Sequence, residues 1–237
     1  MDQTLLAIDS SSQGCSVALN YRGQRIALAS DEPRSHARSL LPLIDQLLSQ
    51  AGIELQQLDA IALVHGPGSF TGIRIALSVA QGLAYGANLP LIGVSSLRCL
   101  AERALPLASE PCTLVCAIDA RMQELYWAAF HFDGKQIKPA GSEGVMGYAE
   151  FNHALRQFDT ELVGVGSGFK LDELELERFH CFHQNIEPSA EAVLEVLSKE
   201  ASLDKLKVAA DKLEPLYLRN EVAWQKRQRI RSEAPLL

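Results

Sequence analysis

The chain of 237 residues lacks several features that mark whole classes of protein. No uninterrupted apolar stretch reaches the roughly 18 residues that a membrane-spanning helix needs. The opening residues, MDQTLLAIDSSS, have no basic segment ahead of an apolar core, so we expect no signal peptide and a cytoplasmic protein. The five cysteines are scattered and odd in number, which predicts buried, reduced thiols rather than a disulfide framework or a zinc site.

An excess of positive charge is also missing, because the formal net charge is −7. Proteins that grip nucleic acid on their own usually present a basic surface, since phosphate contacts dominate their affinity. The exception is the end of the chain, where basic residues surround Trp224. One interpretation is a solvated terminal helix. The other is a contact with RNA or with an acidic partner, for which the candidates are Arg219, Lys226, Arg227 and Arg229.

Common catalytic signatures are absent as well. The sequence has no Gly-x-Ser-x-Gly nucleophile elbow, no His-Glu-x-x-His zinc motif and no Gly-Lys-Ser/Thr phosphate loop. His180 and His183 lie in a strand-like segment, where a spacing of three places side chains on opposite faces and disfavours a metal site. A peptidase is therefore poorly supported, because neither a nucleophile–base pair nor a metal site is visible.

What the sequence does contain is an internal repeat. Residues 5–26 align with residues 114–137, each with an apolar strand, Ala-Ile-Asp, a polar turn and a second apolar strand, so Asp9 and Asp119 are equivalent. A second pattern, an apolar strand that runs into a Gly/Ser loop, occurs at 59–70 and again at 160–169. Each half therefore begins with a strand hairpin and continues with a further strand.

Helical patterns fill the intervals, at 35–52, 73–87, 147–158 and 189–201. Pro42 fits only the first turn of a helix, so the first of them should begin near Leu40 or Leu41. The alternation of strands and helices predicts an α/β fold used twice. We expect one lobe at 1–106, a second at 107–210, and a helix or tail at 211–237 that crosses back to the first lobe.

A glycine-rich segment, HGPGSFTGIR, lies between the expected strand at 60–64 and the helix that starts near Ile73. A helix N-terminus attracts anions, and glycines allow close approach, so the segment could hold an anion. It lacks the lysine of a phosphate loop, and a glycine turn that packs the helix against its strand explains it equally well. The hairpin DSSSQGC is the other candidate, with Asp9 able to meet magnesium. Together the two loops contribute Asp9, Ser11, Ser12, Gly66, Gly68, Ser69, Thr71 and Gly72.

Several of these segments carry a family resemblance. LAIDSSSQGCSVAL, SHARSLLPLID, the stretch from ALVHGPGSFTG to LRCLAE, and AIDARMQELYWAAF together resemble the bacterial TsaB family, also called YeaZ. The match weakens after about residue 145, except for PLYLRNEVA. The resemblance implies an actin-like (ASKHA) α/β fold built from two RNase H-like lobes.

The resemblance also implies a function without catalysis. TsaB proteins are paralogues of TsaD, which transfers threonylcarbamoyl to the adenosine beside the anticodon of tRNAs that read codons beginning with A. TsaD holds a metal through an H-x-x-x-H helix, and the comparable segment here, LIGVSSLRCLAERA, has no histidine. The chain should then be a non-catalytic partner of TsaD that acts with the ATPase TsaE and meets tRNA only indirectly. It should need no cofactor of its own, any ATP or ADP lying at an interface with its partners.

In the resembling family two helices form the interface with TsaD, or with a second TsaB when TsaD is absent. The helix at 73–87 is apolar on nearly every face, which fits such a contact. From the residues alone, both helices could instead simply cover the sheet of the first lobe. The interface residues that the resemblance implies are Leu40, Leu41, Ile44, Leu47, Leu48, Ile73, Ala76, Leu77, Ala80, Leu83 and Ala84.

An alternative function belongs to a different class. A small actin-like ATPase or kinase would use the Asp9 hairpin and the loop at 65–72, with Asp119 as the second acidic residue of the cleft. This hypothesis predicts ATP turnover by the chain alone, whereas the partner hypothesis predicts none.

Overall fold

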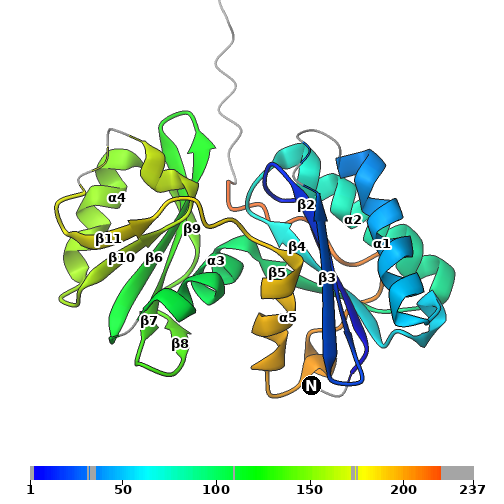
Figure 1. Ribbon diagram of the computed structural model, residues 1–237. Helices are drawn as coiled ribbons and strands as arrows, with labels where there is room; N and C mark the ends of the chain where they lie inside the picture. The colour runs from blue at the N-terminus through cyan, green and yellow to red at the C-terminus, as the bar shows by residue number, and fades with distance from the viewer. Residues whose placement is uncertain are drawn as a thin grey trace, which may run out of the picture.

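The computed structural model describes residues 3–30, 32, 36–108, 110–171, 174 and 176–219. Its strands form two separate sheets, which lie on either side of helix α3, Ser96–Ala104 (Figure 1). The predictions for Lys226, Arg227 and Arg229 fall outside the described residues. Within the described part of the chain, no helix combines the length and the apolar character that crossing a bilayer requires.

The first sheet has five strands in the order β3-β2-β1-β4-β5. β1 pairs antiparallel with β2 and parallel with β4, and β4 pairs parallel with β5. Successive side chains of a strand point to opposite faces, and β1 is buried on both. The strands are β1 (Leu5–Asp9), β2 (Cys15–Tyr21), β3 (Gln24–Ser30), β4 (Ala60–Gly66) and β5 (Leu91–Ser95).

The second sheet repeats this pattern, in the order β11-β10-β6-β7-β8, with β9 also paired to β7. β6 pairs antiparallel with β7 and parallel with β10, as β1 does with β2 and β4. The internal repeat and the actin-like fold of two RNase H-like sheets are therefore confirmed. The strands are β6 (Cys112–Arg121), β7 (Glu124–Phe132), β8 (Ile137–Pro139), β9 (Gly144–Gly147), β10 (Leu162–Val165) and β11 (Phe179–His183).

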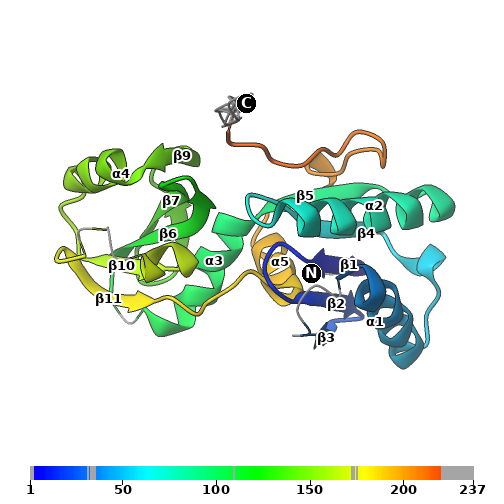
Figure 2. The same ribbon diagram turned by 90° about the horizontal axis from the view of Figure 1, so that it is seen from above.

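Helices cover both faces of the first sheet (Figure 2). α1 (His36–Ala51) and α2 (Phe70–Ala87) share a core with the β1 side chains Leu6 and Ile8. On the opposite face, α5 (Ala190–Ser198) packs on Leu5 and Ala7. α4 (Tyr148–Ala154) covers the second sheet, and α3 contributes to the cores of both sheets.

Helix α1 begins one turn earlier than expected. We expected a start near Leu40 or Leu41 because of Pro42, but the first helical residue is His36. Pro42 thus lies inside the helix, where it has no N–H to donate to the carbonyl of Arg38. His36 and Leu40 are both buried, so packing of this first turn outweighs the missing hydrogen bond.

Residues 208–219, which we call the C-terminal strap, return to the first sheet as a segment with a turn at residues 210–212 (Figure 2). Val208 bridges to Leu91 of β5, and Leu213 enters the core beneath α2. We expected a helix or tail over 211–237 that crosses back to the first lobe, and the described part of it, residues 211–219, is not helical. The lobe boundaries at 107 and 210 stay a prediction. Helix α5 lies within the expected second lobe in sequence but packs on the first sheet.

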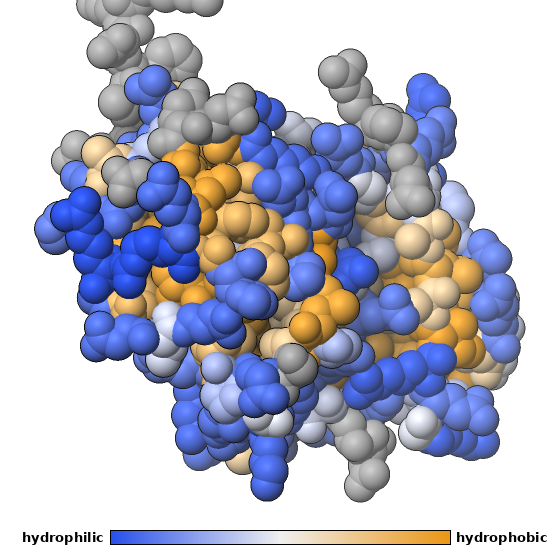
Figure 3. Space-filling view, turned by 60° about the vertical axis from the view of Figure 1, so that its left-hand side comes forward, coloured by the Kyte–Doolittle hydropathy of each residue, from blue (hydrophilic) through white to orange (hydrophobic). Residues whose placement is uncertain are grey.

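The positions of the cysteines agree with the prediction of buried, reduced thiols. Four are buried, and Cys181 on β11 is half-buried, all as free thiols. On the face of the molecule that Figure 3 shows, hydrophilic side chains surround patches of apolar surface.

Candidate functional site

A cleft of about 660 Å³ opens between the two sheets. Turns from both sides line it, as expected where strands end in an actin-like fold. The first sheet contributes residues 11–13 and 68–70, and the second contributes residues 118–121 together with Ser167, Lys170 and Leu171. Leu100, Tyr126, residues 186–188 and Arg219 also line it.

Asp9, at the end of β1, is held inside the protein rather than presented to the cleft. It is buried, and its Oδ1 accepts a hydrogen bond from the backbone N–H of Ser11 at 2.9 Å. Burial raises the pKa of Asp9 above its usual range, although the hydrogen bonds from Ser11 oppose this shift. An internally bonded carboxylate of this kind does not fit the role of a magnesium ligand.

The glycines of the 65–72 loop are explained by close packing. A Cβ on Gly72 would stand 1.8 Å from the carbonyl oxygen of Ser10, and one on Gly68 would stand 2.6 Å from that of Ser11. Two hydrogen bonds fasten the loop to the hairpin, from Ser69 N to the Ser11 carbonyl at 2.8 Å and from Ser10 Oγ to the Gly72 carbonyl at 2.8 Å. The loop therefore acts as a close-packed joint between helix and hairpin.

Ser69 and Thr71 take different places at the start of α2. The helix begins at Phe70, three residues before the expected start, and Ser69 is its N-cap, with Oγ accepting from Gly72 N at 3.2 Å. Thr71 is exposed within the first turn. Ser11, Ser12, Gly68 and Ser69 line the cleft, so the structure brings these four candidate anion-loop residues together. Asp9, Gly66, Thr71 and Gly72 are not among its lining residues.

The second sheet repeats the Asp9 geometry with one decisive change. Asp119 Oδ1 accepts from the backbone N–H of Arg121 at 2.8 Å, as Asp9 does from Ser11. The guanidinium of Arg121 then reaches back to Asp119 Oδ2 at 3.1 Å. The second acidic residue that the ATPase hypothesis requires is thus paired with an arginine of its own turn. Neither of the two acidic residues that the ATPase hypothesis names is therefore free in this structure to hold magnesium, and we derive no reaction step through a nucleotide complex.

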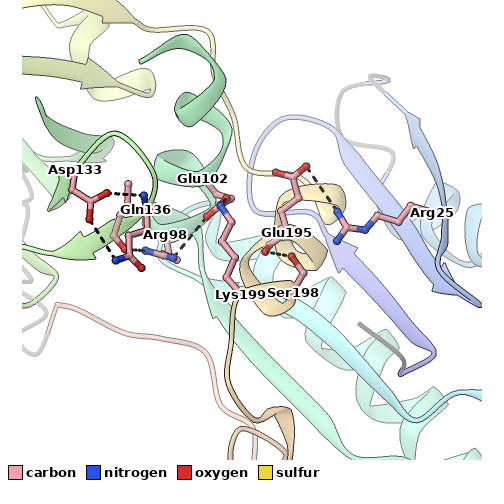
Figure 4. A network of polar contacts seen from close by, with 9 residues as sticks. Arg25, Arg98, Glu102, Asp133, Gln136, Glu195, Ser198 and Lys199 are labelled. Carbon is pink, nitrogen blue, oxygen red and sulfur yellow. Dashed lines mark hydrogen bonds and ion pairs between the residues drawn. The ribbon is translucent and has the colours of Figure 1, made fainter. Parts of the chain in front are cut away.

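Helix α3 is the segment for which the sequence analysis noted the lack of histidine. Two of its polar side chains have partners inside the protein. The Ser96 hydroxyl donates to the carbonyl of Pro67. The buried Glu102 forms an ion pair with Lys199 and lies 3.7 Å from Arg98 (Figure 4). Across the described residues, no group of three or more His, Cys, Asp or Glu is placed to hold a metal ion.

The two remaining histidine candidates also lie apart from each other. β11 confirms that His180 and His183 are in a strand. His180 pairs with Glu161 at 2.8 Å, and His183 lies 3.9 Å from the Sγ of Cys181. They therefore have separate partners.

Most of the expected partner-interface residues are in the core. Leu41 is exposed, and Leu48 and Leu83 are half-buried. The inner faces of α1 and α2 pack on the first sheet and on each other, and contact of these residues with a partner stays a prediction. The buried ones are Leu40, Ile44, Leu47, Ile73, Ala76, Leu77, Ala80 and Ala84.

The strap makes contacts with both sheets that the sequence analysis did not predict. His65 Nδ1 donates to the carbonyl of Glu214 at 3.0 Å, and burial lowers the pKa of His65 although this bond opposes the shift. Arg219 contacts the second sheet, where it pairs with Glu124 and donates to the Ala120 carbonyl at 3.1 Å. The strap thereby joins both sheets at the mouth of the cleft. The sequence showed only that Arg219 is basic. Its partners could not be predicted, because Glu124 and Ala120 are distant from it in the sequence.

Comparisons with known proteins agree with this geometry. The family model described as TsaD, tRNA N6-adenosine threonylcarbamoyltransferase, matches residues 29–170. The tRNA threonylcarbamoyladenosine biosynthesis protein TsaB of Haemophilus influenzae is 36% identical, over 94% of this chain and 96% of that protein. The protein of the same name from Escherichia coli is 38% identical, over 94% of this chain and 97% of its own length.

A solved structure extends the likeness to three dimensions. YeaZ from Pseudomonas aeruginosa superposes with a TM-score of 0.82 at 37% identity, and the match covers 92% of this chain and all of the other. Likeness of sequence and of structure thus extends over nearly the whole molecule. The chain belongs to the TsaB (YeaZ) family.

Proposed function

We propose that this chain is the non-catalytic partner of the transferase TsaD in the threonylcarbamoyl modification of tRNA. In this role it acts with the ATPase TsaE on the adenosine next to the anticodon of tRNAs that read codons beginning with A. The observation that carries the proposal is a combination: whole-length likeness to TsaB proteins, and an α3 with no histidine where the resembling transferases hold their metal.

The residues of α3 support a structural role for this helix. Leu97, Leu100 and Ala101 face the core of the second sheet, while Cys99 faces that of the first. Glu102 is 2% exposed and is paired with cations, so it is not free to act as an acid or a base. A helix that joins two cores in this way positions the lobes, and we expect it to contribute no reacting group.

The outward face of α2 is the surface that we assign to TsaD. Ser78, Gly82 and Gly86 recur every four residues on this face and are exposed. A Cβ on Gly82 or Gly86 would meet nothing within 4 Å, so packing inside the chain does not require glycine there. Glycine inside a helix costs about 1 kcal/mol relative to alanine. Glycine at these positions would let a helix of another molecule approach closely, which is a sufficient reason for its presence despite this cost.

The same face supports the other assemblies of the proposal. When TsaD is absent, a second copy of this chain would occupy it, so homodimer and heterodimer compete. TsaE would join the assembly afterwards, and any ATP or ADP would lie at an interface with these partners. The tRNA would be gripped by TsaD, and we place the whole complex in the cytoplasm.

Light scattering of mixtures with purified TsaD tests the proposed surface. The wild-type chain should form a heterodimer, and Gly82→Trp should abolish it because a bulky side chain blocks close approach. Ala149→Trp, at an exposed position of α4, is the matched control and should leave the heterodimer intact. Equal complex formation by both variants would refute the assignment of this face.

A further inference from the structure

A groove of about 420 Å³ lies between helix α3, the end of α5 and strands β7 and β8 of the second sheet. It is distinct from the cleft, since the two have no lining residue in common. Sites for small molecules measure roughly 300–1,000 Å³, so the groove is large enough for a small ligand. We call it the α3 groove, and its walls include Arg98, Phe130, Ile137, Glu143, Val196 and Lys199.

Arg98 enters the α3 groove from α3 with most of its hydrogen-bonding capacity unused. Its side chain is 19% exposed. Among the contacts of the described residues, its guanidinium makes a single hydrogen bond, from Nη1 to the Ile137 carbonyl at 3.4 Å. Glu102 lies 3.7 Å away, which is close enough for an ion pair but too far for a hydrogen bond (Figure 4). The planar guanidinium can therefore still donate two parallel hydrogen bonds to a carboxylate.

Glu143 brings a carboxyl group to the same groove without a cationic partner. Its Oε2 accepts a hydrogen bond from the hydroxyl of Ser95, the N-cap of α3, at 2.7 Å. Burial raises the pKa of Glu143, although this hydrogen bond opposes the shift. Within the described part of the chain, no ion pair joins Glu143 to a cation, Arg98 included. An ammonium group of a ligand would supply the missing countercharge.

The charges that line the α3 groove are balanced. Lys199 and Glu200 also face it, which makes two cations and two carboxylates in all. Lys199 is already paired with the buried Glu102. A purely anionic ligand such as phosphate would face both carboxylates, and a diamine would face both cations. A small zwitterion, with one charge of each sign, fits this arrangement better than either.

The rest of the wall is largely apolar. Phe130 on β7 and Ile137 on β8 belong to the core of the second sheet, whereas Val196 on α5 belongs to a core of the first. These side chains are well placed to contact an apolar part of the ligand. Because they come from both halves of the molecule, a ligand in the groove would touch both halves at once.

We propose that the α3 groove binds a free α-amino acid with an apolar side chain. Arg98 would hold the carboxylate and Glu143 the ammonium group, while the apolar wall would receive the side chain. The inference is independent of the proposed function, which assigns no ligand to this groove. It gives the chain a small-molecule site of its own, away from the cleft and from the outward face of α2.

Isothermal titration calorimetry of the full chain with L-valine, L-leucine and L-phenylalanine tests the proposal. These three amino acids share both charges and differ in the size of the apolar side chain, so at least one of them should bind. The N-acetyl derivative of the amino acid that binds lacks the ammonium charge, and its amide lacks the carboxylate. Each derivative should bind about tenfold more weakly or worse, because each loses one charged hydrogen-bonded contact.

Two variants test the assigned residues. Glu143→Gln keeps an oxygen that can accept from Ser95 but removes the charge, and it should weaken binding about tenfold or more. Arg98→Lys keeps a cation but loses the planar fork, so it should also weaken binding. Glu150→Gln, at an exposed position of α4, is the matched control and should bind like the wild type. Melting temperatures without amino acid show whether each variant is folded, and the two ligand derivatives test the same contacts on the unaltered chain.

Two results would overturn the proposal. One is the absence of binding by all three amino acids. The other is equal affinity for the amino acid, its N-acetyl derivative and its amide, which would mean that neither charge is recognised. Neither result affects the proposed function, which is measured separately by complex formation with TsaD and by tRNA modification.

Discussion

Gly72 and Ser10 touch backbone to backbone, so closely that a Cβ on Gly72 would stand 1.8 Å from the Ser10 carbonyl oxygen. The Ser10 hydroxyl in turn donates to the Gly72 carbonyl at 2.8 Å. This contact joins the first turn of α2 to the hairpin that borders the cleft. At Gly72 this close contact supports a packing role for the glycine loop rather than an anion-binding role.

Gly72→Ala should therefore destabilise the fold by about 3 kcal/mol or more, because the overlap is with backbone that has little room to move. The free energy of unfolding in urea measures this. Gly82→Ala is the control within the same helix: its Cβ meets nothing, so the change should stabilise by about 0.5–1 kcal/mol. A tolerated Gly72→Ala would mean that the two backbones separate easily.

The buried carboxyl of Asp9 predicts a pH dependence. Its pKa in the folded protein is raised above the ordinary value of 3.8, so the folded state binds the proton more tightly than the unfolded state. Its contribution to stability is therefore fully present below about pH 3.8 and is lost as pH rises through the raised pKa.

Asp9→Asn should accordingly be more stable than the wild type at neutral pH, and the difference should disappear in acid. The asparagine oxygen can still accept from Ser11 N, so the turn is kept. Melting temperatures measured across the acid range check this. An Asp9→Asn variant that is less stable at neutral pH would show that the charge itself is needed.

The ion pair between Glu102 and Lys199 ties α3 to the end of α5 (Figure 4). Glu102 is almost fully buried, while Lys199 is partly exposed. Lys199→Ala should cost about 2 kcal/mol, because it leaves a buried carboxylate with only Arg98 nearby.

Lys207→Ala removes an ion pair with the exposed Asp204 and should change stability by less than about 0.5 kcal/mol. Chemical denaturation of both variants gives the comparison. Equal effects would show that Glu102 gains enough from Arg98 or from water to do without Lys199.

Much of the fold was predictable because it rests on local pattern. Alternating apolar strands and the repeated Ala-Ile-Asp hairpins gave the two sheets, and helical spacing gave the positions of α1, α2, α4 and α5. The start of α1 was not predictable, since the burial of His36 depends on tertiary packing that outweighs the rule for Pro42.

The site was predictable only in part, for a physical reason. Helical spacing shows that Leu47 and Ala80 lie on apolar helix faces, but it does not show whether such a face packs on the chain's own sheet or on a partner. In the structure both residues are buried within the chain. The pairing of Asp119 with Arg121 depends on a turn whose residues adopt left-handed backbone conformations, which no pattern in that turn signals. The strap contacts join residues more than 90 positions apart.

The most direct test of the proposed function is a reconstituted modification of tRNA. TsaD, TsaE, ATP, the threonylcarbamoyl donor and unmodified tRNA are combined with or without this chain, and threonylcarbamoyladenosine is measured in the digested tRNA. We predict product only when this chain and TsaD are both present, and none from this chain without TsaD. Equal product with and without the chain, or product from the chain in the absence of TsaD, would contradict its role as a non-catalytic partner.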